Sequence, residues 1–215
     1  VSADLTRTDF DSAIMENANL TSALWDETDF TDSYLFGAVI DDVNLAGGIL
    51  RGTNFETVEL PNADFAGVEL IHVNFFRAVL MGSDFAGAVV QDSNFIGADL
   101  SEAIFTYASL KGCNFTGTIL SGADLQAADF SGADLTLQDL RPFNLSESTF
   151  IGANLHEAIL EGLFLAGVDF SRSHLVELNC RNCDLSGAVL ADANLTSANL
   201  TKANLNAADL TSANL

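Results

Sequence analysis

Apolar residues recur at every fifth position along the whole chain. Of the 43 positions divisible by five, from Leu5 to Leu215, 38 are Leu or Phe. The remaining five are apolar as well: Met15, Trp25, Ile40, Val90 and Cys180. No insertion interrupts this phase, so the sequence predicts one array of five-residue repeats that forms a single domain over residues 1–215.

A period of five suits neither an α-helix nor a straight strand. On a helix, successive apolar side chains would be spread around the axis instead of lying on one stripe. On a straight strand, an odd spacing sends them to alternate faces. The pattern fits a chain that turns a corner every five residues. Each repeat then has a central Leu or Phe, a second inward residue two positions earlier, an outward residue between them, and two corner residues after the centre.

The residue types agree with these positions. The second inward position is Ala in 22 of the 43 repeats, and most of the others are also small. Fifteen of the 16 Gly occupy the second corner position, where tolerance of unusual φ is useful, and Gly48 is the exception. Asp and Asn are frequent at the outward position. The sequence therefore predicts a solenoid of short β segments and turns with a filled interior.

The Phe residues indicate how many repeats close one coil. They recur at every second repeat from Phe55 to Phe115, and at every fourth repeat through Phe130, Phe150 and Phe170. A four-sided coil, which closes after four repeats, places the first series in two columns on opposite faces and the second in a column on a third face. Four Asn residues also stack in this 20-residue frame, in the manner of an Asn ladder: Asn54, Asn74, Asn94 and Asn114. We expect an all-β fold, a four-sided parallel β-helix of nearly eleven coils.

The cleanest repeats lie in Ala193–Leu215, which reads ANLTS ANLTK ANLNA ADLTS ANL. This phrase, A-[D/N]-[L/F]-x-x, resembles the pentapeptide-repeat family, and the resemblance covers all 215 residues. It implies a right-handed quadrilateral β-helix. It implies less about function, because the family includes uncharacterised cyanobacterial and plant proteins as well as acidic proteins that bind gyrase.

The chain is strongly acidic, with 30 acidic and 8 basic residues and a net charge of −22. Half of the acids occupy the outward position of the repeat, while residues 1–42 hold ten acids against only Arg7. This charge excludes direct binding to nucleic acid or to an anionic membrane. It favours a basic protein partner, or serves solubility. No apolar run is long enough to span a membrane.

The chain begins at Val1 without a visible leader, so localisation stays open between the cytoplasm and a lumenal or periplasmic space reached with a leader since removed. We expect the C-terminal coils, which no polar cap follows, to pack against a second copy or a further segment.

At the other end, Trp25 is interpreted as a plug beneath the first coils or as a binding aromatic. Pro142, with the large inward residues Phe143 and Leu163, predicts a local bulge.

Few residues suggest chemistry. Cys180 and Cys183 form a C-x-x-C at two inward positions, which indicates core packing or a disulfide, and zinc would need further ligands. His72, His156 and His174 fall on different coils and columns without metal-ligand spacing. No catalytic grouping stands apart from the repeat. We therefore expect a non-enzymatic protein without cofactor or metal.

One predicted face carries alternating apolar and acidic layers. We call eight of its residues the docking strip: Phe36, Val39, Glu56, Glu59, Phe76, Val79, Ile96 and Asp99. One interpretation is structural, because β-branched residues suit stacked strands and the alternation separates like charges. The other is a docking surface with Phe anchors and carboxylates that orient a basic partner.

Two functions follow. The first is a non-catalytic scaffold that displays side chains for protein interaction. The second is an acidic DNA mimic that occupies the DNA site of gyrase, as the family resemblance implies for some members. Against the mimic, the charge gathers near one end of this chain and fades in residues 185–215.

Overall fold

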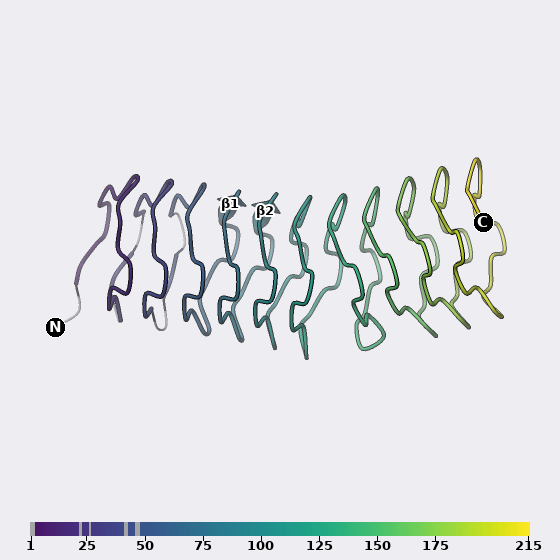
Figure 1. The fold of residues 1–215 in the computed structure, drawn as a ribbon, viewed down its shortest axis with the longest axis horizontal. Helices are drawn as coiled ribbons and strands as arrows, with labels where there is room; N and C mark the ends of the chain where they lie inside the picture. The colour runs from purple at the N-terminus through teal and green to yellow at the C-terminus, as the bar shows by residue number, and fades with distance from the viewer. Residues whose placement is uncertain (1–2, 22, 26, 41–42, 46–47) are drawn as a thin grey trace. The chain divides into compact units, whose positions relative to one another are not determined.

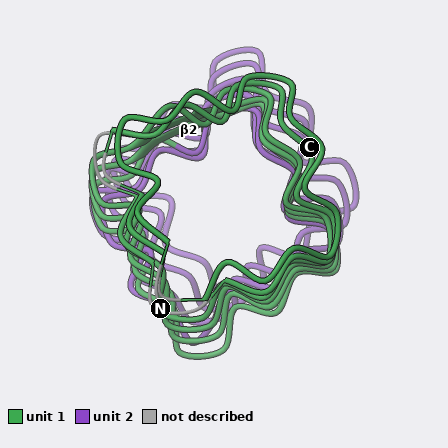
Figure 2. Cartoon of the chain, turned by 90° about the vertical axis from the view of Figure 1, so that its left-hand side faces the viewer, with its two compact units in different colours: residues 1–109, 117–124 green, residues 110–116, 125–215 purple. Residues whose placement is uncertain are grey.

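The computed structural model describes residues 3–21, 23–25, 27–40, 43–45 and 48–215. The chain, traced from its N-terminus to its C-terminus in Figure 1, divides into two compact units, which Figure 2 colours separately. Unit 1 comprises Val1–Ser109 and Gly117–Asp124, and unit 2 comprises Leu110–Thr116 and Leu125–Leu215. In Figure 2 the coils of unit 1 outline a four-sided ring. Because the five-residue phase continues through both units, we propose that they belong to one repeat domain.

Within each unit, backbone segments pair in parallel with segments four repeats away. The two strands β1 (Glu69–Ile71) and β2 (Val89–Gln91) lie in register, with Leu70 opposite Val90. Single bridges with the same offset occur in both units, such as Asn54 with Asn74 in unit 1 and Asp134 with Asn154 in unit 2. The fold is thus an all-β, right-handed, four-sided β-helix with a 20-residue coil, as predicted. No helix in the described part of the chain could cross a membrane.

The interior of unit 1 is built from two columns of Phe rings. Phe55, Phe75 and Phe95 stack with centroid distances of 5.4 and 5.0 Å. Phe65, Phe85 and Phe105 stack at 4.7 and 4.8 Å. The two columns meet edge to face, as Phe65 and Phe75 do at 5.9 Å, a favourable geometry for aromatic rings.

Unit 2 has its own column. Phe130, Phe150 and Phe170 stack at 5.3 and 5.2 Å, and Phe115 meets Phe130 edge to face at 5.9 Å. These central side chains are buried. The columns that the 20-residue frame predicts within each unit are therefore present.

The corners are tight turns in which the second corner residue has a left-handed backbone. The N–H of the second inward residue donates to the central carbonyl three positions earlier, as from Ala13 to Phe10 at 2.8 Å. Among the described residues, Pro142 alone at this corner position lacks a positive φ. In the part of the chain that the structure describes, twenty-four non-glycine residues adopt a positive φ, which is uncommon for L-residues outside such turns.

Outward Asp and Asn residues hold the corners that follow them. Their Oδ1 atoms accept a hydrogen bond from the N–H two residues later, as in Asn94 with Ile96 at 3.0 Å and Asp184 with Ser186 at 3.0 Å. This N–H belongs to the first corner residue and would otherwise lack a partner in the ladder. Capping is thus the physical reason for Asp and Asn at the outward position.

Buried hydroxyl groups link successive coils. Thr53 Oγ1 donates to the carbonyl oxygen of Phe30 at 2.9 Å, and Ser83 Oγ donates to that of Leu60 at 3.0 Å. Both pairs have the same sequence separation, 23. Each of these Ser and Thr residues occupies the second inward position, so a polar residue is tolerated there because its hydroxyl has a carbonyl acceptor in the preceding coil.

Two irregular points behave as the sequence suggests. Trp25 is buried and its ring lies 4.6 Å from that of Phe30, in agreement with a plug. Around Pro142 the repeat is disturbed: within the described part of unit 2 the bridge between Asn144 and Phe164 is missing, and the Phe164 side chain is exposed. Proline fixes a negative φ, so it cannot form the left-handed corner.

Candidate interaction surface

The docking strip is a continuous ladder in unit 1. Val39 bridges to Glu59, Glu59 to Val79, and Val79 to Asp99. The preceding corner follows the same register, because the Gly37 N–H donates to the Glu56 carbonyl and the Thr57 N–H to that of Phe76. The structure therefore places the strip residues in two adjacent columns, one coil apart along each column.

Exposure is unequal along the docking strip. Phe36, Val39 and Glu59 are exposed, whereas the other five members are half-buried. The guanidinium of Arg77 lies 4.9 Å above the Phe76 ring, so a cation–π contact already covers part of that ring. The apolar surface available to a partner is thus greatest at the N-terminal end of the strip.

The acidic members of the strip differ in what binds them. Asp99 is a corner cap, with Oδ1 accepting from the N–H of Ser101 at 3.0 Å. Glu56 accepts a long hydrogen bond from Asn74 at 3.5 Å. Glu59 precedes Pro61 by two residues, and proline has no N–H to cap. Two of the three carboxylates therefore have no corner to stabilise.

Outside the strip, several outward carboxylates accept hydrogen bonds from the corner residues that follow them. The side chain and N–H of Ser186 donate to Asp184 and lower the pKa of that carboxyl group, and Thr211 lowers the pKa of Asp209 in the same way. Burial raises the pKa of Asp129, but hydrogen bonds from Ser131 and the Lys111 side chain outweigh it and leave the value lowered. These carboxylates are engaged in their own turns, unlike Glu59.

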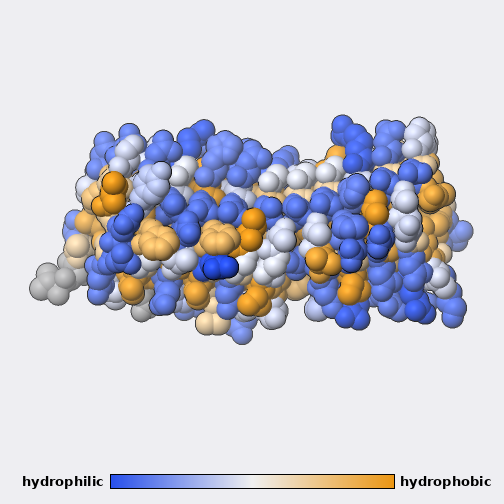
Figure 3. Space-filling model, viewed as in Figure 1, coloured by the Kyte–Doolittle hydropathy of each residue, from blue (hydrophilic) through white to orange (hydrophobic). Residues whose placement is uncertain are grey.

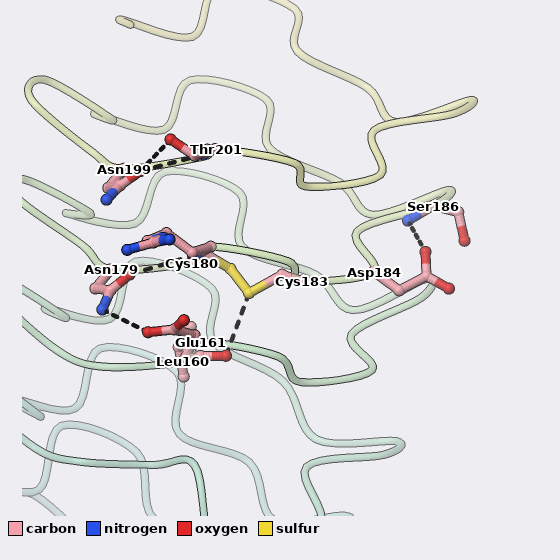
Figure 4. The surroundings of a disulfide bond; sticks show 10 residues. Leu160, Glu161, Asn179, Cys180, Cys183, Asp184, Ser186, Asn199 and Thr201 are labelled. Atoms are coloured by element: carbon pink, nitrogen blue, oxygen red, sulfur yellow. Dashed lines mark hydrogen bonds between the residues drawn. A yellow bond between two sulfur atoms is a disulfide. The ribbon is translucent and has the colours of Figure 1, made fainter.

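The C-x-x-C of unit 2 lies inside the coil (Figure 4). Cys180 and Cys183 are buried and joined by a disulfide that spans one corner. The Cys183 Sγ lies 3.2 Å from the carbonyl oxygen of Leu160, where other coils place a Ser or Thr hydroxyl. The sequence left core packing and a disulfide as open interpretations, and in the structure the two buried cysteines form the disulfide. Cys113 is a buried free thiol.

Two of the three histidines, His156 and His174, are closer together than their sequence positions indicate. The rings of His156 and His174 lie 6.2 Å apart, and His156 Nε2 lies 3.1 Å from a Glu157 carboxylate oxygen. The reason is a diagonal neighbourhood, in which a first corner residue meets an outward residue of the next coil, as Thr136 meets Asn154. Even so, the described residues bring no three His, Cys, Asp or Glu side chains together as metal ligands.

Figure 3 shows hydrophobic and hydrophilic side chains interleaved over the face in view. Together, the coil and its columns define a solenoid that displays side chains at fixed spacing. A family model for pentapeptide repeats matches residues 1–24, 13–52, 40–77, 78–117, 118–141, 144–176 and 179–215. The chain belongs to the pentapeptide-repeat family.

Among solved structures, HetL is similar to this chain. It is a pentapeptide repeat protein involved in heterocyst differentiation regulation in the cyanobacterium Nostoc sp. strain PCC 7120. The two are 28% identical over 98% of this chain and 90% of HetL, with a TM-score of 0.48. No curated protein matches the chain.

Two other similar structures are those of a plant protein and of a plasmid-encoded protein. A pentapeptide repeat protein of the Arabidopsis thaliana thylakoid lumen is 30% identical over 42% of this chain and 60% of its own, with a TM-score of 0.33. QnrB1, a plasmid-mediated fluoroquinolone resistance protein, is 16% identical over 90% of this chain and 93% of its own, with a TM-score of 0.40.

Proposed function

We propose that this protein is a non-catalytic scaffold that binds a partner protein through the docking strip. The observation that supports the proposal best is the N-terminal part of the strip, where Phe36 and Val39 are exposed beside Glu56 and Glu59. An exposed aromatic ring next to carboxylates that cap no corner suits a partner with apolar and basic groups.

The test is the double substitution Phe36→Ser and Phe76→Ser, compared with the native chain in pull-downs from the source organism. We expect the specific partners to be lost, because both anchors contribute apolar contact area. Phe164→Ser in unit 2 is the matched control, since it removes an exposed Phe outside the strip. An unchanged partner list with the double variant would remove the strip from consideration.

A DNA mimic that binds gyrase is the alternative. Its support is the net charge of −22, together with neighbouring coils that place outward carboxylates in pairs, such as Asp9 with Asp29 and Asp64 with Asp84. A supercoiling assay with purified gyrase separates the two proposals. Inhibition at low micromolar protein would favour the mimic, and full activity would favour the scaffold.

We also propose that the C-terminal coils associate with a second copy. Leu200, Leu205 and Leu210 are half-buried there, whereas the central residues from Ile40 to Leu190 are buried. Covering these side chains would remove apolar surface from water. Analytical ultracentrifugation at tens of micromolar is the test: a dimer supports the proposal and a monomer counts against it.

A further inference from the structure

A cluster of exposed apolar side chains lies at one corner of unit 1, and we call its four residues the apolar corner: Ile14, Tyr34, Phe36 and Val39. Their exposed fractions are 75, 50, 40 and 44%. Ile14 and Tyr34 are bridge partners on successive coils. Tyr34 and Phe36 flank the buried Leu35 and so project from the same side of the segment. The apolar corner therefore extends the docking strip onto the neighbouring face.

The outward residues of the apolar corner do not cap the turn that follows them. At many corners an outward Asp or Asn accepts the N–H two residues later, as Asp4 and Asp9 do, but Ile14 and Tyr34, like other apolar outward residues such as Val79, provide no side-chain acceptor there. Within the described part of unit 1, the first corner residues that follow them therefore lack this cap. What sets these two residues apart is that they forgo this hydrogen bond and still leave large apolar side chains exposed to water, which is a mark of an interaction surface.

Carboxylates surround the apolar corner. Glu16 and Glu56 flank Phe36, one coil to either side, because the Asn17 N–H donates to the Phe36 carbonyl and the Gly37 N–H to that of Glu56. Glu59 is the bridge partner of Val39. Within the residues that the structure describes, none of these three glutamates forms an ion pair.

The nearby basic charge is already engaged. Arg7 is the single basic residue within positions 1–42, which hold ten acids, and its Nε lies 2.7 Å from Glu27 Oε2. An apolar patch framed by unpaired carboxylates is complementary to a partner that carries apolar anchors between basic groups.

We propose that the apolar corner binds a basic amphipathic helix of a partner protein. This rests on the proposed interaction function and names the chemistry of the partner. Glu16 and Glu56 are two coils apart, which is roughly 9.6 Å at the spacing of paired strands. On a helix, basic residues at positions i and i+7 lie on one face about 10.5 Å apart. Apolar residues at i+3 and i+4 then fall between them, opposite Tyr34 and Phe36.

The experiment uses the full chain and a synthetic, labelled alanine-based peptide with Lys at i and i+7 and Leu at i+3 and i+4. Fluorescence anisotropy at physiological ionic strength gives the affinity. Three further peptides are compared: a scramble of the same composition, a version with Glu in place of Lys, and a version whose helix is interrupted by Pro. We expect the amphipathic basic peptide to bind at least about tenfold more tightly than each of these.

Variants of the protein locate the contact. Tyr34→Ser with Phe36→Ser is expected to weaken binding at least about tenfold, because it removes the aromatic anchors. Glu16→Gln with Glu56→Gln is expected to weaken it severalfold and to reduce its dependence on salt. Phe164→Ser, far along the sequence in unit 2, is expected to leave it unchanged. All five side chains are at least partly exposed, so circular dichroism should show each variant folded.

Several results would overturn the proposal. These are equal affinity for the scrambled peptide, tight binding of the Pro-containing peptide, full affinity in the Tyr34/Phe36 variant, or no measurable binding of the basic helical peptide. If the peptide fails while the Phe36/Phe76 variant still loses its partners in pull-downs, then only the helix proposal is wrong and the interaction function stands.

Discussion

At the scale of single residues, the polar side chains that a repeat position accepts depend on the hydrogen-bond partners available there. The second inward position accepts Ala because it is small, and accepts Ser or Thr because the hydroxyl meets a carbonyl of the preceding coil. Gln138 follows the same principle, since its Nε2 donates to the carbonyl of Phe115 at 2.8 Å. Most buried polar side chains of this interior have a matched donor, whereas the Ser33 hydroxyl and the Trp25 indole N–H are buried without a hydrogen-bond partner among the described residues.

The Thr53 hydroxyl tests this rule. We expect Thr53→Val, which keeps the shape and removes the donor, to lower the free energy of unfolding by about 1 kcal/mol, as the loss of one buried hydrogen bond does. Thr53→Ser is the control, because it keeps the hydroxyl that Ser83 uses in the same position. Denaturant unfolding measures both. Equal stability of the Val variant and the native chain would show that the bond between Thr53 and Phe30 contributes nothing.

Residue-level patterns can be predicted from the sequence only in part. The burial of Leu and Phe follows from their period. The capping role of Asp and Asn does not, because it depends on which N–H groups the ladder leaves unpaired. The proximity of His156 and His174 is also hidden, since the diagonal between a first corner residue and the next coil becomes visible only once the coil is closed. A search for pairs of polar residues along that diagonal would find it.

At the scale of elements, the corner turn is the unit that fixes the fold. Glycine at the second corner position indicates where φ is positive. Gly87, for example, has a φ of +64°, which glycine adopts without the steric cost that a Cβ atom would bring. Most corners lack glycine, however, and the same backbone is imposed on residues such as Tyr107 and Leu137. Coil-to-coil hydrogen bonds on both sides of the turn overcome the local preference, so residue type alone does not predict the turn.

Leu137 offers a test of this strain. Its φ is +63° and its side chain is exposed, so Leu137→Asn should relieve strain without loss of buried surface. We expect the free energy of unfolding to rise by roughly 0.5 to 1 kcal/mol. The opposite kind of change is Gly152→Leu, whose side chain would meet no neighbouring atoms but would sit on a backbone with a φ of +66°. We expect it to lower the free energy of unfolding by about 1 kcal/mol. Thermal unfolding measures both; shifts of the same sign would contradict the account.

At the scale of the whole molecule, the proposed interaction surface is built from columns of side chains on successive coils. The sequence predicts the four-sided coil because its Phe columns are regular, and the strip register follows from that coil. The apolar corner is not predicted, because Ile14 and Tyr34 belong to a different face from Val39. Tyr34 is already next to Phe36 along the chain, and the coil adds Ile14 by pairing it with Tyr34.

The register of columns is most directly tested by engineered disulfides in unit 1. Val79 and Asp99 are bridge partners four repeats apart, so Val79→Cys with Asp99→Cys should form a crosslink under mild oxidation, which mass spectrometry of non-reduced peptides can map separately from the native cysteines. The control is Val79→Cys with Asn94→Cys, three repeats apart and on different faces. A crosslink in the first pair alone is the predicted result. A crosslink in the control pair, or none in the first pair, would contradict the four-sided coil and every surface derived from it.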